Sequence, residues 1–194
     1  MFEFADILTY IAVGIWLWLP AMIPNVSAVI IGRKFGRTKM DFGRTWRGKR
    51  ILGDGKSWAG FFGGAFTGVF VGIVQICVAA KFGSDDYWRF GPFWGNIGIL
   101  FCLSFGALVG DACGAFIKRR LGMEKGAKAL ILDQYDFFVG AIIITAMCFP
   151  EFVKSNYIEG MHIAALIFVV ILTYVMHRTV NIIGYRIGVK DVPW

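Results

Sequence analysis

Charged residues are scarce in this sequence: they make up 17% of its 194 residues, whereas hydrophobic residues make up 57%. A soluble chain of this length has too little interior to bury so much apolar surface, because small domains have a high surface-to-volume ratio. The mean hydropathy of +0.65 indicates that lipid is the remaining solvent. Soluble enzymes, DNA-binding domains and disordered tails are therefore excluded.

Patterns for disulfide or zinc sites are also missing. The four cysteines lie in or near apolar runs without C-x-x-C spacing, and His162 and His177 are too far apart to share a ligand. These spacings argue against a disulfide framework or a zinc site. A signal peptide is disfavoured as well, because Glu3 and Asp6 stand where a basic segment is required.

Long apolar runs are what the sequence does contain. Crossing about 30 Å of hydrocarbon takes about 20 helical residues, and five stretches reach or approach that length. They cover roughly residues 7–31, 58–80, 93–117, 137–149 and 158–177. The fourth is short, so its first turn must begin at or inside the membrane boundary, which draws Asp133 and Asp136 toward lipid. The sequence predicts an all-α, polytopic membrane protein with about five transmembrane helices, in a single domain over residues 1–194.

The basic residues predict the orientation of these spans. Of the 20 Lys and Arg residues, nine lie in the loop of residues 32–57, five between the third and fourth spans, and three near the C-terminus. Only three lie on the opposite side. Because cytoplasmic loops carry the excess of Lys and Arg, the N-terminus is expected outside and the C-terminus in the cytoplasm. The cytoplasmic loops are then residues 32–57 and about 118–136.

Small residues recur every four positions in the second and third spans. Such faces let helices approach closely and gain packing that lipid cannot supply. If the two antiparallel spans pack through these faces, residues 53–60 lie beside residues 110–120 at the cytoplasmic end. The residues concerned are Gly60, Gly64, Gly68 and Gly72 in one span and Gly106, Gly110 and Gly114 in the other.

Three aspartates lie at the cytoplasmic ends of two spans. Asp111 is deep in an apolar helix, where an unpaired carboxylate costs several kcal/mol, so it is a functional candidate; the structural alternative is an ion pair with Lys118. Asp133 and Asp136 precede the fourth span, where the alternatives are an N-cap and a favourable helix-dipole charge. Three carboxylates among basic residues favour a Mg²⁺ site at which Lys and Arg hold phosphates.

The stretch Gly53-Asp54-Gly55-Lys56-Ser57 precedes the second span. It is similar to the end of a P-loop, but Arg50 stands where that motif has its first glycine. Glycines leave backbone N–H groups free, a helix N-terminus attracts anions, and Lys56 adds a positive charge. The stretch therefore predicts phosphate binding without the P-loop motif. The D-G-x-x-A-R pattern of alcohol phosphotransferases is absent.

Two blocks of sequence resemble a known family. Gly110-Asp111, then Lys118-Arg119-Arg120, then Leu132-Asp133-Gln134-Tyr135-Asp136 resemble the signature of membrane CTP:phosphatidate cytidylyltransferases, in which a K-R segment is followed by L-D-R-x-D. The short length, the five spans and the G-D-G-K-S stretch are more similar to the archaeal branch, the CDP-archaeol synthases. The resemblance covers roughly residues 24–60 and 106–138. The chain departs from the family at Ala115, where a serine is usual, and at Ala59, where W-R-G or W-E-G is common.

The resemblance implies Mg²⁺-dependent transfer of CMP from CTP to a lipid phosphate, with release of pyrophosphate. The implied acceptor is an unsaturated archaeal ether lipid, 2,3-bis-O-geranylgeranylglycerol 1-phosphate, and the implied product is CDP-archaeol. The resemblance implies a site that faces the cytoplasm at the cell membrane, with no nucleic-acid partner. It makes Asp111, Asp133 and Asp136 metal ligands, with Lys118 as a further catalytic residue. The implied nucleotide and phosphate contacts are Asn25, Asp54, Lys56, Ser57, Arg119 and Arg120.

Other functions make different demands on the sequence. A CDP-diacylglycerol synthase acting on ester phosphatidate shares the same motifs. Acyltransferases and phosphatases normally need a histidine or a nucleophile in a loop, and the sequence offers neither. If the chain were a small membrane transporter, charged residues near the bilayer midplane and an internal repeat would be expected. The charges here lie at span ends instead, and the sequence has no internal repeat. The lipid tails, the number of metal ions and the oligomeric state stay open at this point.

Overall fold

The computed structural model describes residues 4–82, 88–91, 93–123, 127, 129, 131–188 and 192–193. Glu3 and parts of the loop after the third span lie outside these ranges. The helices are α1 (Phe4–Phe35), α2 (Trp58–Lys81), α3 (Phe93–Arg120), α4 (Leu132–Cys148), α5 (Pro150–Tyr157) and α6 (Ile163–Arg186), with a 3-10 helix η2 (Gly160–His162) before α6. Within these described ranges, four helices are long and apolar enough to cross a membrane, and α4 with α5 makes a fifth if that bent pair is one span. The predicted all-α, polytopic architecture is confirmed.

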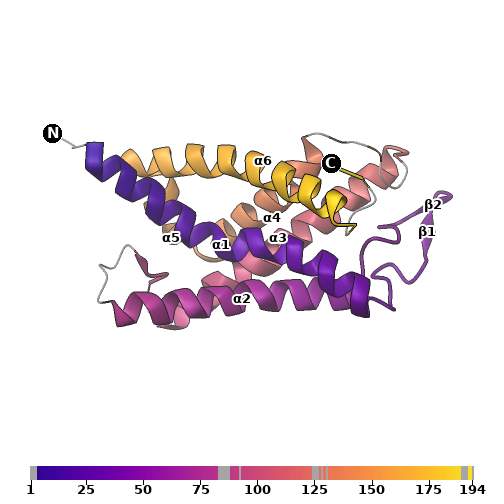
Figure 1. Cartoon of the computed structure of the whole chain (residues 1–194), viewed down its shortest axis with the longest axis horizontal. Helices are drawn as coiled ribbons and strands as arrows, with labels where there is room; N and C mark the ends of the chain where they lie inside the picture. The colour runs from indigo at the N-terminus through magenta and orange to yellow at the C-terminus, as the bar shows by residue number, and fades with distance from the viewer. Residues whose placement is uncertain are drawn as a thin grey trace.

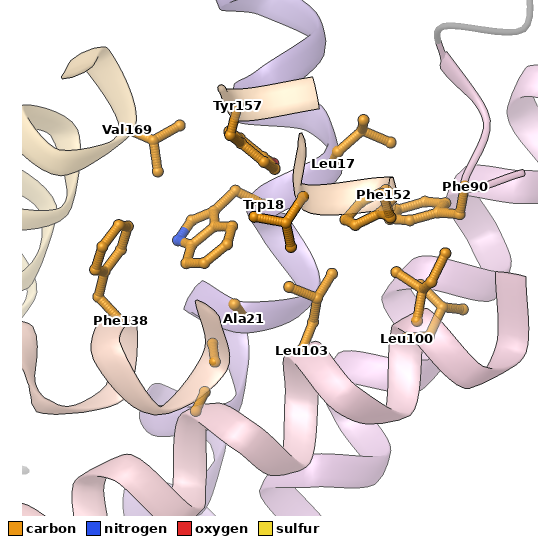
Figure 2. Close-up of a cluster of buried hydrophobic side chains, with 14 of the residues drawn as sticks. Leu17, Trp18, Ala21, Phe90, Leu100, Leu103, Phe138, Phe152, Tyr157 and Val169 are labelled. Atoms are coloured by element: carbon orange, nitrogen blue, oxygen red, sulfur yellow. The ribbon is translucent and has the colours of Figure 1, made fainter. Parts of the chain in front are cut away.

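Helix α1 is the centre of the assembly, because it packs against α2, α3 and α6 (Figure 1). The start of α1 and the end of α6 lie toward opposite ends of the molecule (Figure 1). The core gathers around Trp18 of α1, which contacts the rings of Phe138 and Tyr157 (Figure 2). Aliphatic and aromatic side chains of α3, α5 and α6 complete it, among them Leu103, Phe152 and Val169.

Two prolines inside α1 explain why polar residues are buried on its neighbours. A proline lacks the N–H that would bond to the carbonyl four residues earlier, so Pro20 frees the carbonyl of Trp16 and Pro24 frees that of Pro20. Gln75 Nε2 of α2 donates to Trp16 O at 2.6 Å, and Ser104 Oγ of α3 donates to Pro20 O at 3.0 Å. Neighbouring helices thus satisfy both freed carbonyls, as an apolar solvent demands.

The predicted fourth span is a bent pair of helices. Helix α4 has 17 residues, about 25 Å at about 1.5 Å per residue, which is short for a bilayer. Pro150 begins α5 and holds Phe149 outside the helical region. The chain therefore bends by 120° between α4 and α5. Helix α4 begins at Leu132, five residues before the predicted span, and so it includes both Asp133 and Asp136.

The glycine faces pack against other partners than predicted. A Cβ on Gly64 would meet Pro24 O of α1 at 2.6 Å, and a Cβ on Gly110 would meet the Gly140 Cα of α4 at 2.9 Å. Gly60 and Gly64 therefore bring α2 onto α1, and the three glycines of α3 bring it onto α4. Gly72, in contrast, lies against Leu100 of α3, so the prediction that the glycine faces join α2 to α3 is right at this position and wrong for most of the others. Glycine periodicity identifies a close-packing face without identifying the helix that packs on it.

The expected meeting of residues 53–60 with the end of α3 is nevertheless confirmed. The loop between α1 and α2 folds into a hairpin of β1 (Thr45–Trp46) and β2 (Lys49–Arg50), and Lys39 forms an isolated bridge with Ser57. The guanidinium of Arg120, at the end of α3, donates to the carbonyls of Trp46, Lys49 and Arg50. The hairpin, the start of α2 and the end of α3 lie at the same end of the molecule (Figure 1).

Candidate active site

The turn that precedes α2 places a lysine against the aspartate of α3. Ser57 is the N-cap of α2, with its hydroxyl accepting from the Gly60 N–H at 3.2 Å. Lys56, one residue earlier, forms an ion pair with Asp111 of α3, and both side chains are partly buried. The predicted alternative partner of Asp111, Lys118, is engaged elsewhere. The G-D-G-K-S stretch and the aspartate in the third span therefore belong to one site.

The second ion pair joins α3 to α4. Lys118 Nζ contacts Asp133 Oδ1, and the Ala129 N–H donates to Asp133 Oδ2 at 2.9 Å. The residue that caps α4 is Ile131, without a side-chain bond, so the alternative of Asp133 as the N-cap is wrong: Asp133 lies in the first turn. There its carboxylate reaches both Lys118 and the preceding loop.

Asp136 lies between these two pairs. A Cβ on Gly114 would meet Asp136 Cβ at 2.8 Å, so the absence of a side chain at Gly114 makes room for this carboxylate against α3. Asp136 Oδ1 accepts from the Phe137 N–H at 2.7 Å. Its charge interacts with those of Asp111, Lys56 and Lys118. The three predicted metal ligands thus form one electrostatic cluster with two lysines.

The cluster fits a hard cation by its chemistry. Its donors are carboxylate oxygens, which Mg²⁺ prefers, and two ammonium groups now neutralise part of their charge. Among the residues that the structure describes, no three His, Cys, Asp or Glu side chains are close enough together to form a ready metal site. Bringing the three carboxylates onto one ion would require the lysines to move, for example onto phosphate groups. The assignment of the metal ligands stays a prediction.

The other predicted contacts are dispersed. Asp54 is exposed and pairs with Arg50 at 2.8 Å. Arg119 donates to Met123 O and lies against Gly53, while Arg120 is committed to the hairpin carbonyls and lies over the rings of Trp46 and Phe116. In this arrangement Arg120 anchors the hairpin, and a phosphate would have to compete with three carbonyl oxygens for it.

A cavity of about 360 Å³ opens beside Lys56 and Asp111. It is bordered by α1, α2, α3 and α6 and also includes Asn25, whose Oδ1 is buried and accepts no hydrogen bond from the described residues. Most of the lining is aliphatic, including Val29 and Ile183. The charged residues of the lining are Lys56 and Asp111, and most of the other lining residues are apolar, which suits an amphiphile with an anionic head.

Two residues of this cavity were missed by the sequence reasoning. The His177 ring stacks on the Phe137 ring, with 5.8 Å between the ring centroids. One turn later, Asn181 Nδ2 lies 3.3 Å from His177 Nδ1, within hydrogen-bond distance. Both line the cavity. The available signal was a pair of polar residues four positions apart in an apolar helix, which puts both on one face.

Comparison with known proteins shows the family to which this chain belongs. Residues 6–194 match the CarS-like family, described as CDP-archaeol synthase. A CDP-archaeol synthase of Picrophilus torridus is 44% identical, covering 93% of this chain and 95% of its own length. The corresponding protein of Archaeoglobus fulgidus is 43% identical and covers 93% and 96%. A solved structure of an intramembrane enzyme for archaeal membrane lipid biosynthesis superposes with a TM-score of 0.63 at 32% identity, covering 89% of this chain and 94% of that one. The chain therefore belongs to the CarS-like family of CDP-archaeol synthases, membrane cytidylyltransferases that use CTP.

Proposed function

We propose that this chain transfers CMP from CTP to an isoprenoid ether lipid phosphate in a Mg²⁺-dependent reaction that yields CDP-archaeol and pyrophosphate. The observation that carries the proposal is the Lys56–Asp111 ion pair in the lining of a mostly apolar cavity. A cation, a carboxylate and an apolar wall meet there, and the reaction needs all three. The names of the relatives support the same reaction.

The proposed step is an in-line displacement. An oxygen of the lipid phosphate attacks the α-phosphorus of CTP, the new P–O bond forms, and the bond to the departing pyrophosphate breaks. A phosphomonoester is largely ionised at neutral pH, so the protein needs no strong general base. Asp111, Asp133 and Asp136 would hold Mg²⁺, which supplies charge neutralisation between the two anions. Lys56 and Lys118 orient the phosphates and stabilise negative charge on the leaving group.

The cavity between α1 and α6 is the proposed place of the lipid acceptor. A second, mostly apolar cavity of about 390 Å³ lies between α3 and α4, and among the described residues of its lining Asp136 is the only charged one. An anionic phosphate is repelled by a lone carboxylate, whereas the first cavity offers Lys56 beside Asp111. We therefore assign the lipid phosphate to the Lys56 end of the first cavity and its isoprenoid chains to the aliphatic part.

The site is proposed to face the cytoplasm. The loop between α1 and α2 and the end of α3 carry most of the basic residues, and such loops remain on the cytoplasmic side. CTP is made in the cytosol, so the water-soluble substrate reaches this end directly. The N-terminus is then outside and the C-terminus inside.

The proposal is tested with purified protein in detergent, labelled CTP, Mg²⁺ and a lipid phosphate. We expect pyrophosphate release and a labelled CDP-lipid with the isoprenoid ether phosphate, and loss of both when the metal is chelated. An ester phosphatidate in a parallel reaction tests the competing acceptor. The proposal is rejected if no tested lipid phosphate releases pyrophosphate, and its ether specificity is rejected if the ester reacts equally well.

Filling the acceptor cavity should weaken lipid binding without affecting nucleotide binding. Val29→Trp introduces a large ring into the aliphatic lining, so we expect the KM for the lipid phosphate to rise about tenfold, since a few buried methylene groups are worth about 1–2 kcal/mol. The KM for CTP should stay within about twofold of the wild-type value. Ile171→Trp, on an exposed part of α6, is the matched control and should change neither constant. An equal rise in both KM values would place the lipid elsewhere.

A further inference from the structure

One buried carboxylate lies outside the proposed site. Asp41 is in the loop between α1 and α2, and its side chain is fully buried although residues 42–49 around it are exposed. Burial raises the pKa of Asp41, but hydrogen bonds from Arg50 and from the N–H groups of Gly53, Leu52 and Gly43 outweigh it, so the pKa lies well below its ordinary value. The side chain therefore stays charged at any pH at which a membrane enzyme works.

Asp41 uses its acceptor capacity within the loop. Oδ1 accepts from Arg50 Nη2 at 2.7 Å and from the Gly43 N–H at 3.1 Å. Oδ2 accepts from Arg50 Nε at 3.2 Å and from the N–H groups of Leu52 and Gly53, both at 3.0 Å. A carboxylate with five donors on its two oxygens has little left for a metal or a substrate. These hydrogen bonds hold the two sides of the loop together, so Asp41 serves as an internal anchor of the loop.

The anchored backbone leads to Lys56. Gly53 adopts a positive φ of 90°, which glycine tolerates without strain, and this turns the chain toward α2. The Met40 N–H, next to Asp41, donates to Lys56 O at 3.0 Å, and the Trp58 N–H donates to Thr38 O at 3.1 Å. Residues 38–41 and 52–58 are thereby tied to each other on both sides of Lys56.

We infer that Asp41 is a positioning residue that acts through Lys56: by holding Leu52 and Gly53 it keeps the Lys56 ammonium on Asp111. The inference rests on the proposed function for the catalytic importance of Lys56, but the placement of Lys56 is a separate, measurable property. Small errors in the position of a group that orients phosphates lower turnover strongly; a displacement of about 1 Å can cost about 100-fold.

The test combines kinetics with labelling of Lys56. Asp41→Asn should lower kcat/KM for CTP about 10- to 100-fold. In a protein that already carries Lys56→Ala, adding Asp41→Asn should lower kcat/KM by less than about threefold more, because Asp41 and Lys56 act as one unit. Amine-reactive labelling followed by mass spectrometry should show Lys56 reacting several-fold faster in Asp41→Asn, relative to the exposed Lys34 of the same molecule. Arg50→Lys keeps the charge but loses the two-pronged contact, and it should shift both readouts in the same direction by less.

Thr45→Ala, an exposed change in the same hairpin, is the control and should alter neither readout. Unchanged Lys56 labelling in both Asp41→Asn and Arg50→Lys overturns the inference, as does a full additional loss in the Lys56→Ala background. A wild-type protein that does not turn over CTP would defeat the proposed function and the part of this inference that concerns turnover. Faster labelling in Asp41→Asn would still establish that Asp41 places Lys56.

Discussion

Asp111→Asn is expected to lower turnover about 1,000-fold or more while leaving the fold intact. The substitution keeps the shape of the side chain but removes the charge that pairs with Lys56 and lies close to Asp136. A neutral amide is a poor ligand for a hard cation and no longer holds the lysine. Steady-state cytidylyl transfer in detergent measures the loss, and circular dichroism with size-exclusion chromatography verifies the fold.

The control for this experiment is a carboxylate at the other end of the molecule. Glu151→Gln removes the same charge from the exposed start of α5 and should retain wild-type turnover. Asp133→Asn should resemble Asp111→Asn, because it removes the partner of Lys118 in the same cluster. Activity within about tenfold of wild type in Asp111→Asn would contradict the role assigned to the cluster.

Gly140→Leu is expected to have the largest effect on stability. A Cβ at this position would lie 2.5 Å from Gly110 Cα and 2.6 Å from Gly110 N, both backbone atoms that cannot move aside without separating α3 from α4. Overpacking of this kind costs several kcal/mol, which corresponds to a fall in Tm of about 10 °C or more. Thermal unfolding in detergent gives the Tm, and chromatography shows whether the protein still elutes as a single species.

Val139→Leu is the matched control for that substitution. Val139 is adjacent in sequence but exposed on α4, so the larger side chain should enter lipid with a change in Tm of less than about 2 °C. A Gly140→Leu protein as stable as this control would mean that α3 and α4 do not meet at Gly110. Because the α3–α4 contact also brings Asp136 onto Gly114, residual folded Gly140→Leu protein should be inactive.

The course of the helices was largely readable from the sequence. Apolar runs long enough to span a bilayer correspond to helices, since a chain in hydrocarbon must satisfy its backbone internally. The predicted helix ends were less accurate where charged residues or a proline shift the end of a helix. Helix α4 starts at Leu132 because a charged first turn is compatible with the membrane boundary, and it stops at Cys148 because Pro150 cannot continue it.

The partners of individual side chains required the tertiary structure. The sequence selected Asp111, Asp133 and Lys56 by residue type and by resemblance, but it paired Asp111 with Lys118 as the structural alternative. Helical spacing puts Asp111 and Lys118 on one face, whereas the folded loop presents Lys56 to Asp111 and α4 presents Asp133 to Lys118. Contacts between distant segments depend on how helices cross, and local periodicity contains no such information.

The sequence by itself determined that this protein is a helical membrane protein whose basic residues gather at span ends, because burying charge in lipid is costly, and it predicted phosphate chemistry among those residues. Only the tertiary structure decided which helices the glycine faces join, and that Asp41 is an internal anchor of the loop. It also decided that His177 and Asn181 border the cavity beside Lys56. These features depend on contacts across the chain, where close packing and hydrogen-bond geometry select one arrangement among many that the same pattern allows.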